Sequence, residues 1–130
     1  PMSAPDPGPL DNLLIDRDDA VAVVTVNRPK VLNALNGQTL DELRRAILAL
    51  KHDDTIRCVI LTGAGDKAFV AGADINELAV DTPTSGRDRA MRGQHIFDLI
   101  GEAARSAKFT PRVKFVEVSG ICPRCAASQK

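Results

Sequence analysis

The residues best suited to chemistry form a small-residue turn, Ala71-Gly72-Ala73-Asp74, just before a short predicted helix. Gly72 permits backbone dihedrals that other residues avoid, and the flanking alanines keep bulky side chains away from the backbone. A helix that begins here would leave its first N–H groups unpaired, facing outward with the positive end of the helix dipole. Such donors suit a carbonyl oxygen that gains negative charge. The turn therefore predicts an oxyanion site, although an ordinary helix entry with small residues for close packing explains the same pattern.

Ionisable side chains near this turn allow acid–base chemistry as a second interpretation. Asp74 and Glu77 lie one helical turn apart, so either could serve as a general base. An acidic residue in a first helical turn also complements the helix dipole, which is the simpler role. His95 is a helical histidine with no second ligand, and His52 lies at a predicted helix end, where its charge suits the C-terminal carbonyls. We therefore expect no metal site.

A glycine-containing segment, residues 63–68 (GAGDKA), matches the loose dinucleotide-binding pattern that follows a strand. A nucleotide site of that type requires a helix that starts at about Gly65. The next residues, 68–70, have an extended pattern instead, and no Gly-Lys-Ser/Thr supports a P-loop. Nucleotide binding therefore stays a weaker alternative that a helix at Gly65 would support.

The three cysteines do not indicate a disulfide framework, because their number is odd and Cys58 lies in an apolar run. Cys122 and Cys125 form a lone C-x-x-C pair. A closed zinc site wants four ligands, and a redox pair wants a helix N-terminus that no βαβ context supports here. We expect a reducing, cytoplasmic environment.

The composition is that of a globular protein, with 44% hydrophobic and 26% charged residues among 130. The absence of Trp and Tyr argues against a nucleic-acid surface built on stacking, and no apolar run has the length of a membrane span. We expect neither partner. Residues 1–102 hold 11 Lys and Arg against 16 Asp and Glu, whereas residues 103–130 hold six against one. This break predicts a boundary near residue 102.

Alternating strand and helix patterns surround the turn and predict an α/β fold. An edge strand is expected over residues 10–17. A strand buried on both faces is expected over 20–26, where the sequence is apolar and β-branched, and a second buried strand over 57–62. A helix between the latter two strands favours a right-handed crossover. The remaining expectations are an N-cap at Asn36 with a helix to about His52, a loop over residues 81–86, a helix over 87–100 and a possible strand over 113–118.

Two segments together carry a resemblance to a known family. Residues 26–35 (VNRPKVLNAL) precede the first predicted helix, and residues 67–75 (KAFVAGADI) precede the second. With the apolar strands beside them, over about residues 12–101, they resemble the N-terminal part of the crotonase superfamily, closest to enoyl-CoA hydratases. The resemblance implies a crotonase-like superhelix of ββα units, of which this chain would hold the N-terminal portion only, and assembly as a trimer or hexamer.

The resemblance also implies a lyase that hydrates 2,3-unsaturated acyl-CoA thioesters in fatty acid β-oxidation, with no cofactor beyond the coenzyme A of its substrate. Family members hold the thioester oxygen with two backbone N–H groups, and the first of these donors matches Ala73. His95 and Phe97 match the region that covers the acyl chain. The positions that match the coenzyme A site and the rest of the first-half pocket are Lys30, Val31, Leu32, Ala71, Gly72, Asp74 and Ile75.

The sequence departs from the family pattern after the second predicted helix. Family members continue with a strand and a glycine-rich turn that supplies the second donor and a catalytic Glu, whereas residues from Ala103 are basic and unrelated. We expect three regions: a disordered leader over residues 1–9, a crotonase-like region over 10–102 and an unrelated basic tail over 103–130. The tail could be folded or disordered. A truncated chain, from a frameshift, alternative end or fusion, or a divergent family member would explain this. We therefore expect a poor hydratase; the alternative is a non-catalytic module that binds acyl-CoA or takes part in assembly.

Overall fold

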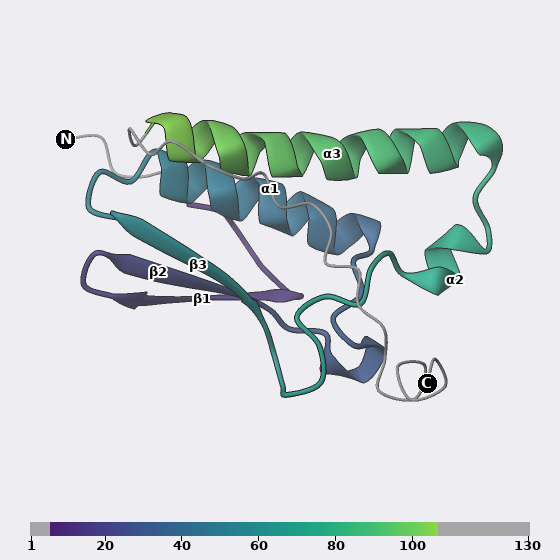
Figure 1. Cartoon of the computed structure of the whole chain (residues 1–130), viewed down its shortest axis with the longest axis horizontal. Coiled ribbons are helices and arrows are strands. Elements are labelled where there is room, and N and C mark those ends of the chain that lie inside the picture. The colour runs from purple at the N-terminus through teal and green to yellow at the C-terminus, as the bar shows by residue number, and fades with distance from the viewer. Residues whose placement is uncertain (1–5, 107–130) are drawn as a thin grey trace, which may run out of the picture.

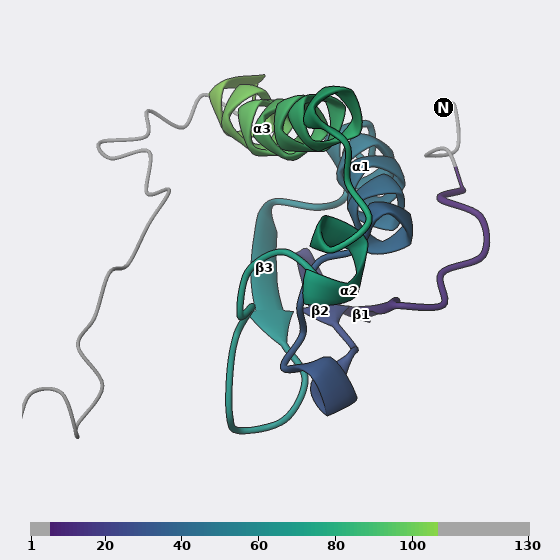
Figure 2. The same cartoon turned by 90° about the vertical axis from the view of Figure 1, so that its right-hand side faces the viewer.

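The computed structural model describes residues 6–106, which form a three-stranded sheet with helices packed on one side (Figure 1). Helices α1 and α3 lie side by side and run in the same direction in both views (Figures 1 and 2). The elements in chain order are β1 (Leu13–Asp18), β2 (Val21–Val26), η1 (Pro29–Val31), α1 (Gly37–Lys51), β3 (Cys58–Gly63), α2 (Ile75–Leu78) and α3 (Pro83–Ser106).

The sheet has the order β1-β2-β3 and combines a hairpin with a parallel crossover. β1 and β2 are antiparallel, and the turn between them places Asp19 at a positive φ of 52°, a conformation that Asp tolerates better than most residues. β2 and β3 are parallel and are joined through α1. The α/β arrangement predicted from the sequence is therefore confirmed.

Helix α1 begins where the sequence predicts. The Asn36 side chain accepts hydrogen bonds from the Thr39 N–H (2.8 Å) and the Thr39 hydroxyl (2.6 Å), which satisfies one of the free donors of the first turn. The apolar stripe of α1 faces the sheet and joins its buried residues in one core. The fully buried members of that core are Leu13, Ala22, Val24, Val26, Leu40, Leu43, Ala46, Leu50 and, from α3, Ile96.

Burial of the two parallel strands differs from the prediction. In β2 only alternate residues are buried and the others are half-buried, because α1 covers one face of the sheet. In β3 the first three residues, Cys58 to Ile60, are exposed. The prediction of one strand buried on both faces and of a second buried strand was wrong because the described residues supply no second layer over the sheet.

The start of α3 also differs from the prediction. Residues 83–86, predicted as loop, belong to the helix. Thr82 and Ser85 cap each other's backbone, since Thr82 N–H donates to Ser85 Oγ (2.9 Å) and Ser85 N–H donates to Thr82 Oγ1 (3.2 Å). Pro83 suits the first helical position because its φ is already helical and its missing N–H would have had no partner. The predicted strand over residues 113–118 and the Cys122–Cys125 pair lie outside the described residues.

Candidate functional site

The two segments singled out in the sequence meet in space at a parallel bridge between Leu35 and Ala73. The Leu35 N–H donates to the Gly72 carbonyl (2.8 Å), and the Asp74 N–H donates to the Leu35 carbonyl (2.9 Å). One step earlier, the Ala71 N–H donates to the Leu32 carbonyl (3.1 Å). The region before α1 and the small-residue turn before α2 thus form one unit.

This bridge determines where the Ala73 N–H points. In a parallel pair, the residue that lies between the two bonded neighbours turns its own N–H and carbonyl to the opposite side. The Ala73 N–H accordingly forms no hydrogen bond with any residue from 6 to 106, and Ala73 is exposed. Gly72 has φ of +120°, a backbone conformation that only glycine adopts readily. The result is an accessible backbone donor on a fixed segment.

The helix after this donor contributes less than the sequence predicts. α2 is a single turn of four residues, so few peptide dipoles add up in it. Its N-cap, Asp74, accepts from the Asn76 N–H (3.0 Å), and the Asp74 carbonyl accepts from Glu77 and Leu78. The prediction that the first N–H groups of this helix stay unpaired was wrong for Asn76 and Glu77, and the Ala73 donor comes from the bridge instead.

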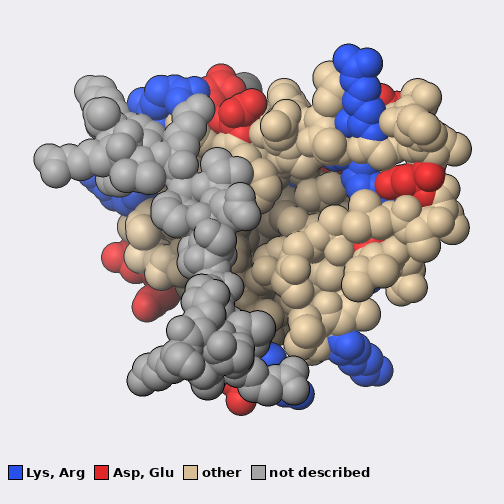
Figure 3. All heavy atoms as spheres, turned by 45° about the vertical axis from the view of Figure 1, so that its right-hand side comes forward, with Lys and Arg blue, Asp and Glu red and all other residues tan. Residues whose placement is uncertain are grey.

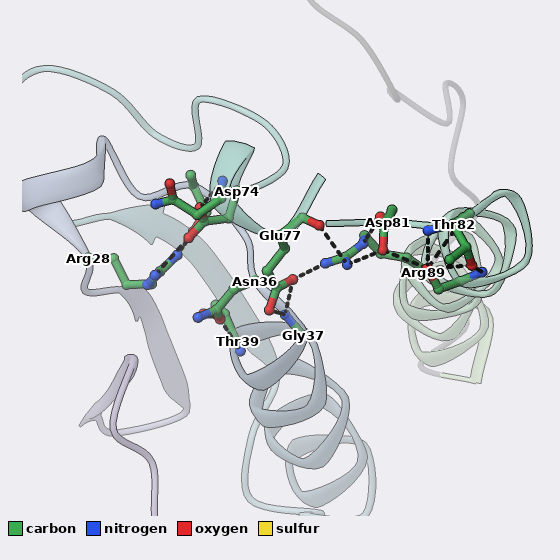
Figure 4. A network of polar contacts seen from close by, with 12 residues as sticks. Arg28, Asn36, Gly37, Thr39, Asp74, Glu77, Asp81, Thr82 and Arg89 are labelled. Carbon is green, nitrogen blue, oxygen red and sulfur yellow. Dashed lines mark hydrogen bonds and ion pairs between the residues drawn. The ribbon is translucent and has the colours of Figure 1, made fainter. Parts of the chain in front are cut away.

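The Asp74 side chain is buried and fully engaged (Figure 4). Its Oδ2 atom lies 3.0 Å from Nη2 of Arg28, and its Oδ1 atom accepts from Asn76. The Arg28 guanidinium, followed by the Asn76 N–H, holds the pKa of the Asp74 carboxyl below its usual value. An ionised carboxylate with both oxygens occupied favours a role in holding the turn over one in proton transfer.

The Glu77 carboxylate is also engaged, with partners on α1 and α3 (Figure 4). Both of its carboxylate oxygens accept from the Gly37 N–H, at 3.1 and 2.9 Å, where α1 begins. Arg89 from α3 forms an ion pair with Glu77 and a two-point contact with Asp81, at 2.8 and 2.7 Å. The Glu77 carboxylate therefore joins α1, α2 and the start of α3.

Asn33 is the residue that sequence reasoning missed. Its buried side chain donates to the carbonyls of Ala64 (2.8 Å) and Ala68 (2.9 Å) and accepts from the Arg28 N–H (2.9 Å). Its backbone φ is 56°, and Leu32 before it has φ of 54°. Asn adopts this left-handed region more readily than most residues, so an Asn in a short segment between strand and helix was the available signal.

The residues predicted to bind substrate differ in their exposure. A cavity of about 140 Å³ lies between the two segments and is lined by Pro29, Leu32, Asn33 and residues 64–68. Among the predicted residues, Leu32 lines this cavity and Asp74 is buried. The others, together with His95 and Phe97 on α3, are exposed: Lys30, Val31, Ala71, Gly72 and Ile75.

Three alternatives can be compared with this geometry. The nucleotide-binding interpretation requires a helix that starts at about Gly65. Residues 64–74 contain no helix, so this interpretation was wrong. Within residues 6–106, no three His, Cys, Asp or Glu side chains gather where they could hold a metal ion. None of the helices in this part of the chain has the length and hydropathy needed to cross a membrane.

Comparison with known proteins identifies the family. The enoyl-CoA hydratase/isomerase family model matches residues 16–110, which is most of the chain. The chain belongs to this family. It is therefore a member of the crotonase superfamily, and the β1-β2-α1-β3 arrangement is an N-terminal portion of the crotonase fold.

Individual relatives of this enoyl-CoA hydratase/isomerase family member support the same family assignment. It is 47% identical over 88 residues to a short-chain-enoyl-CoA hydratase of Clostridium acetobutylicum, covering 68% of this chain and 34% of that protein. It is 40% identical over 90 residues to a crotonyl-CoA hydratase of Syntrophomonas wolfei, covering 69% and 35%. A crystal structure of an enoyl-CoA hydratase/carnithine racemase from Magnetospirillum magneticum superposes with a TM-score of 0.66 at 34% identity, over 71% of this chain and 35% of that one. The chain spans about a third of the length of these relatives.

Proposed function

We propose that this chain is an enoyl-CoA hydratase-like protein whose Ala73 N–H donates to the thioester oxygen of an acyl-CoA. The observation that carries the proposal is the Ala73 donor itself, which is exposed and without a partner within residues 6–106. Addition of water to a 2,3-unsaturated thioester passes through an enolate, whose oxygen gains negative charge. A fixed N–H stabilises that charge, and one such donor contributes about 10²–10³ in rate. The names of the relatives, hydratases of enoyl-CoA and crotonyl-CoA, support this substrate class.

The coenzyme A part of the substrate would lie along the exposed surface next to this donor. Lys30 offers an ammonium group to phosphate oxygens, and Val31 and Leu32 offer apolar contact. Ala71, Gly72 and Ile75 would contact the acyl end, while Asp74 would hold the turn from beneath. Coenzyme A enters as part of the substrate, and we propose no other cofactor.

Hydration also needs groups that move a proton between water and substrate, which contribute about 10²–10⁴ in rate. The two carboxylates nearest to Ala73 in the sequence, Asp74 and Glu77, are both held in ion pairs. We therefore propose that this chain alone hydrates crotonyl-CoA poorly. We also propose that the chain belongs to fatty acid β-oxidation and lies in the cytoplasm. The free and exposed Cys58 is consistent with that reducing compartment.

Hydration of crotonyl-CoA, followed by the loss of absorbance of its conjugated double bond, tests the catalytic part. We expect kcat/KM far below the range of efficient enzymes, and a value of about 10⁶ M⁻¹s⁻¹ or more would contradict the proposal.

Titration calorimetry with acetyl-CoA tests the binding part of the proposal. Ala73→Pro removes the free N–H without breaking a hydrogen bond of the fold, and Ala73→Gly keeps it as the matched control. We expect weaker acetyl-CoA binding for A73P only; equal binding by both would reject the donor.

A second candidate is a non-catalytic module that binds acyl-CoA or assembles with other chains. The observation that favours it is the exposure of large apolar side chains, with Val59 and Ile60 on β3 and Val80 after α2. One face of the molecule consists mostly of uncharged residues, with charged ones towards its margins (Figure 3). Light scattering of the chain, alone and with a full-length hydratase of the family, tests assembly into a trimer, hexamer or mixed complex. A monomer under both conditions, together with no binding of acetyl-CoA by calorimetry, would reject this candidate.

A further inference from the structure

We propose that Arg28 is a positioning residue that acts on the Ala73 donor through two peptide groups; this inference rests on the proposed function. The Arg28 side chain is 16% exposed and reaches both sides of the bridge. Its Nη1 donates to the Ala34 carbonyl, just before Leu35, and its Nη2 contacts Asp74, just after Ala73. One guanidinium thus holds both segments that meet at the donor.

The hydrogen bonds form a continuous chain from this guanidinium to the donor. The Ala34 carbonyl that accepts from Arg28 belongs to the same peptide group as the Leu35 N–H. That N–H donates to the Gly72 carbonyl at 2.8 Å, and the Gly72 carbonyl shares its peptide group with the Ala73 N–H. The order is therefore Arg28, peptide 34–35, peptide 72–73 and then the free N–H of Ala73.

Two physical effects follow from this order. A trans peptide group is planar, with its carbonyl and its N–H in opposite directions, so fixing the Gly72 carbonyl on Leu35 aims the Ala73 N–H outward. Hydrogen-bonded peptide groups also polarise one another, by about 10–30% per bond. A cation at the carbonyl end withdraws electron density along the chain, and it makes the last N–H a better donor to an oxygen that gains negative charge.

A substitution at Asp74 distinguishes this role of Arg28 from a role in the Arg28–Asp74 ion pair alone. It binds the other nitrogen of Arg28, and its side chain is not a member of the peptide chain that leads to Ala73 (Figure 4). If Arg28 acts through the peptide groups, Arg28→Met must weaken the donor much more than Asp74→Asn, which disturbs the turn but keeps the contact of Arg28 with the Ala34 carbonyl. If only the ion pair matters, both substitutions must have the same effect.

The ligand-free test is NMR of the full chain. In R28M we expect the Leu35 amide proton to exchange about tenfold faster, as for a weakened hydrogen bond, and its resonance to move upfield. The distant control Arg17→Met, which loses the Arg17–Asp53 ion pair, should leave both readouts unchanged. D74N, which disturbs the turn, should change both readouts by less than half as much as R28M. The double variant R28M/D74N leaves no unpaired buried carboxylate, so it tests the same point if R28M folds poorly. Leu35 exchange that is unchanged in the folded variants would overturn the inference.

The ligand-bound test is the infrared carbonyl band of acetyl-CoA labelled with ¹³C at the thioester carbon. Bound to the unsubstituted chain, this band should fall in frequency. R28M should lose more than half of the fall, R17M should retain all of it, and D74N should lose less of it than R28M. A band that falls equally with R28M would overturn the role of Arg28. Absence of acetyl-CoA binding by the unsubstituted chain would reject the proposed function instead, and the Leu35 amide would still decide whether Arg28 holds the bridge.

Discussion

Strands β2 and β3 are parallel neighbours of six residues each, with similar apolar sequences, VAVVTV and CVILTG. Their surroundings differ sharply. Ala22, Val24 and Val26 of β2 have no exposed surface, whereas Val59 and Ile60 of β3 are 42% and 48% exposed. β2 lies between two strands beneath α1, while β3 lies at an edge of the described sheet. Burial of an apolar strand therefore depends on its place in the sheet and on the layers beside it.

The two ends of β3 also differ in how closely they are packed. Its first half carries apolar side chains into solvent, and its outer edge has no partner strand within residues 6–106. Its last residue, Gly63, meets the loop that carries the candidate site. The strand is thus loosely surrounded at one end and tightly packed at the other, and substitutions along it should have very different costs.

The largest effect is expected at Gly63. A Cβ there would lie 2.1 Å from the Phe69 carbonyl oxygen and 2.8 Å from both the Ala68 oxygen and Asn33 Nδ2. Because two of these atoms are backbone, Gly63→Ala must displace the loop, and we expect a loss of about 3 kcal/mol in unfolding free energy by urea titration. Gly93→Ala is the control, since nothing lies within 4 Å of its Cβ and alanine favours α3; we expect a gain of up to about 1 kcal/mol. Equal changes in both would show that the end of β3 is not tight.

A direct test of the contrast between the strands is truncation of one side chain in each. Val24→Ala removes two buried methyl groups and should cost about 2 kcal/mol. Ile60→Ala removes a larger group, yet it should cost about 0.5 kcal/mol or less because that side chain is half exposed. Thermal or urea unfolding of the two variants decides the matter. A cost for I60A as large as that for V24A would mean that β3 is covered in solution, for example by another copy.

A buried polar contact beside β1 gives a smaller effect. Glu42 is 1% exposed, and its Oε2 accepts from the Asn12 N–H at 2.8 Å. Glu42→Ala leaves that donor unpaired and should cost about 1.5 kcal/mol of unfolding free energy. Glu102→Ala removes only the exposed end of the Lys51–Glu102 ion pair, so its cost should stay below about 0.5 kcal/mol. Similar costs for the two would contradict the assignment of Glu42 to the packed side of the molecule.

The smallest expected effect depends on pH and concerns the turn that follows β3. The pKa of Asp74 is lowered by Arg28 and by the Asn76 N–H. A depressed carboxyl pKa stabilises the fold above the unfolded value, near pH 4, and this contribution disappears as pH falls through the folded pKa. Asp74→Asn should therefore be less stable than the unsubstituted chain at pH 7, and the difference should shrink below pH 4. A difference that stays constant from pH 7 to pH 3 would show that the Asp74 charge contributes nothing.

Local rules in the sequence were sufficient for several elements. The N-cap residue Asn36 predicted the start of α1, and apolar segments predicted β1 and β2. The motif segments were also found correctly, because short backbone signals such as Gly72 belong to the residues themselves. Where the sequence reasoning failed, at the exposed half of β3 and the start of α3, the outcome depended on neighbouring layers or on a reciprocal Thr82–Ser85 cap.

The site shows the same division. The sequence by itself determined that Ala73 lies in a small-residue turn before a short helix, and that this turn and residues 26–35 together match one family pattern. Only the tertiary structure decided that Leu35 pairs with Ala73, that Asn33 joins the two loops, and that Arg28 spans them. The physical reason is that the direction of a backbone N–H is fixed by the partner of the preceding carbonyl, and that partner lies 37 positions earlier in the chain.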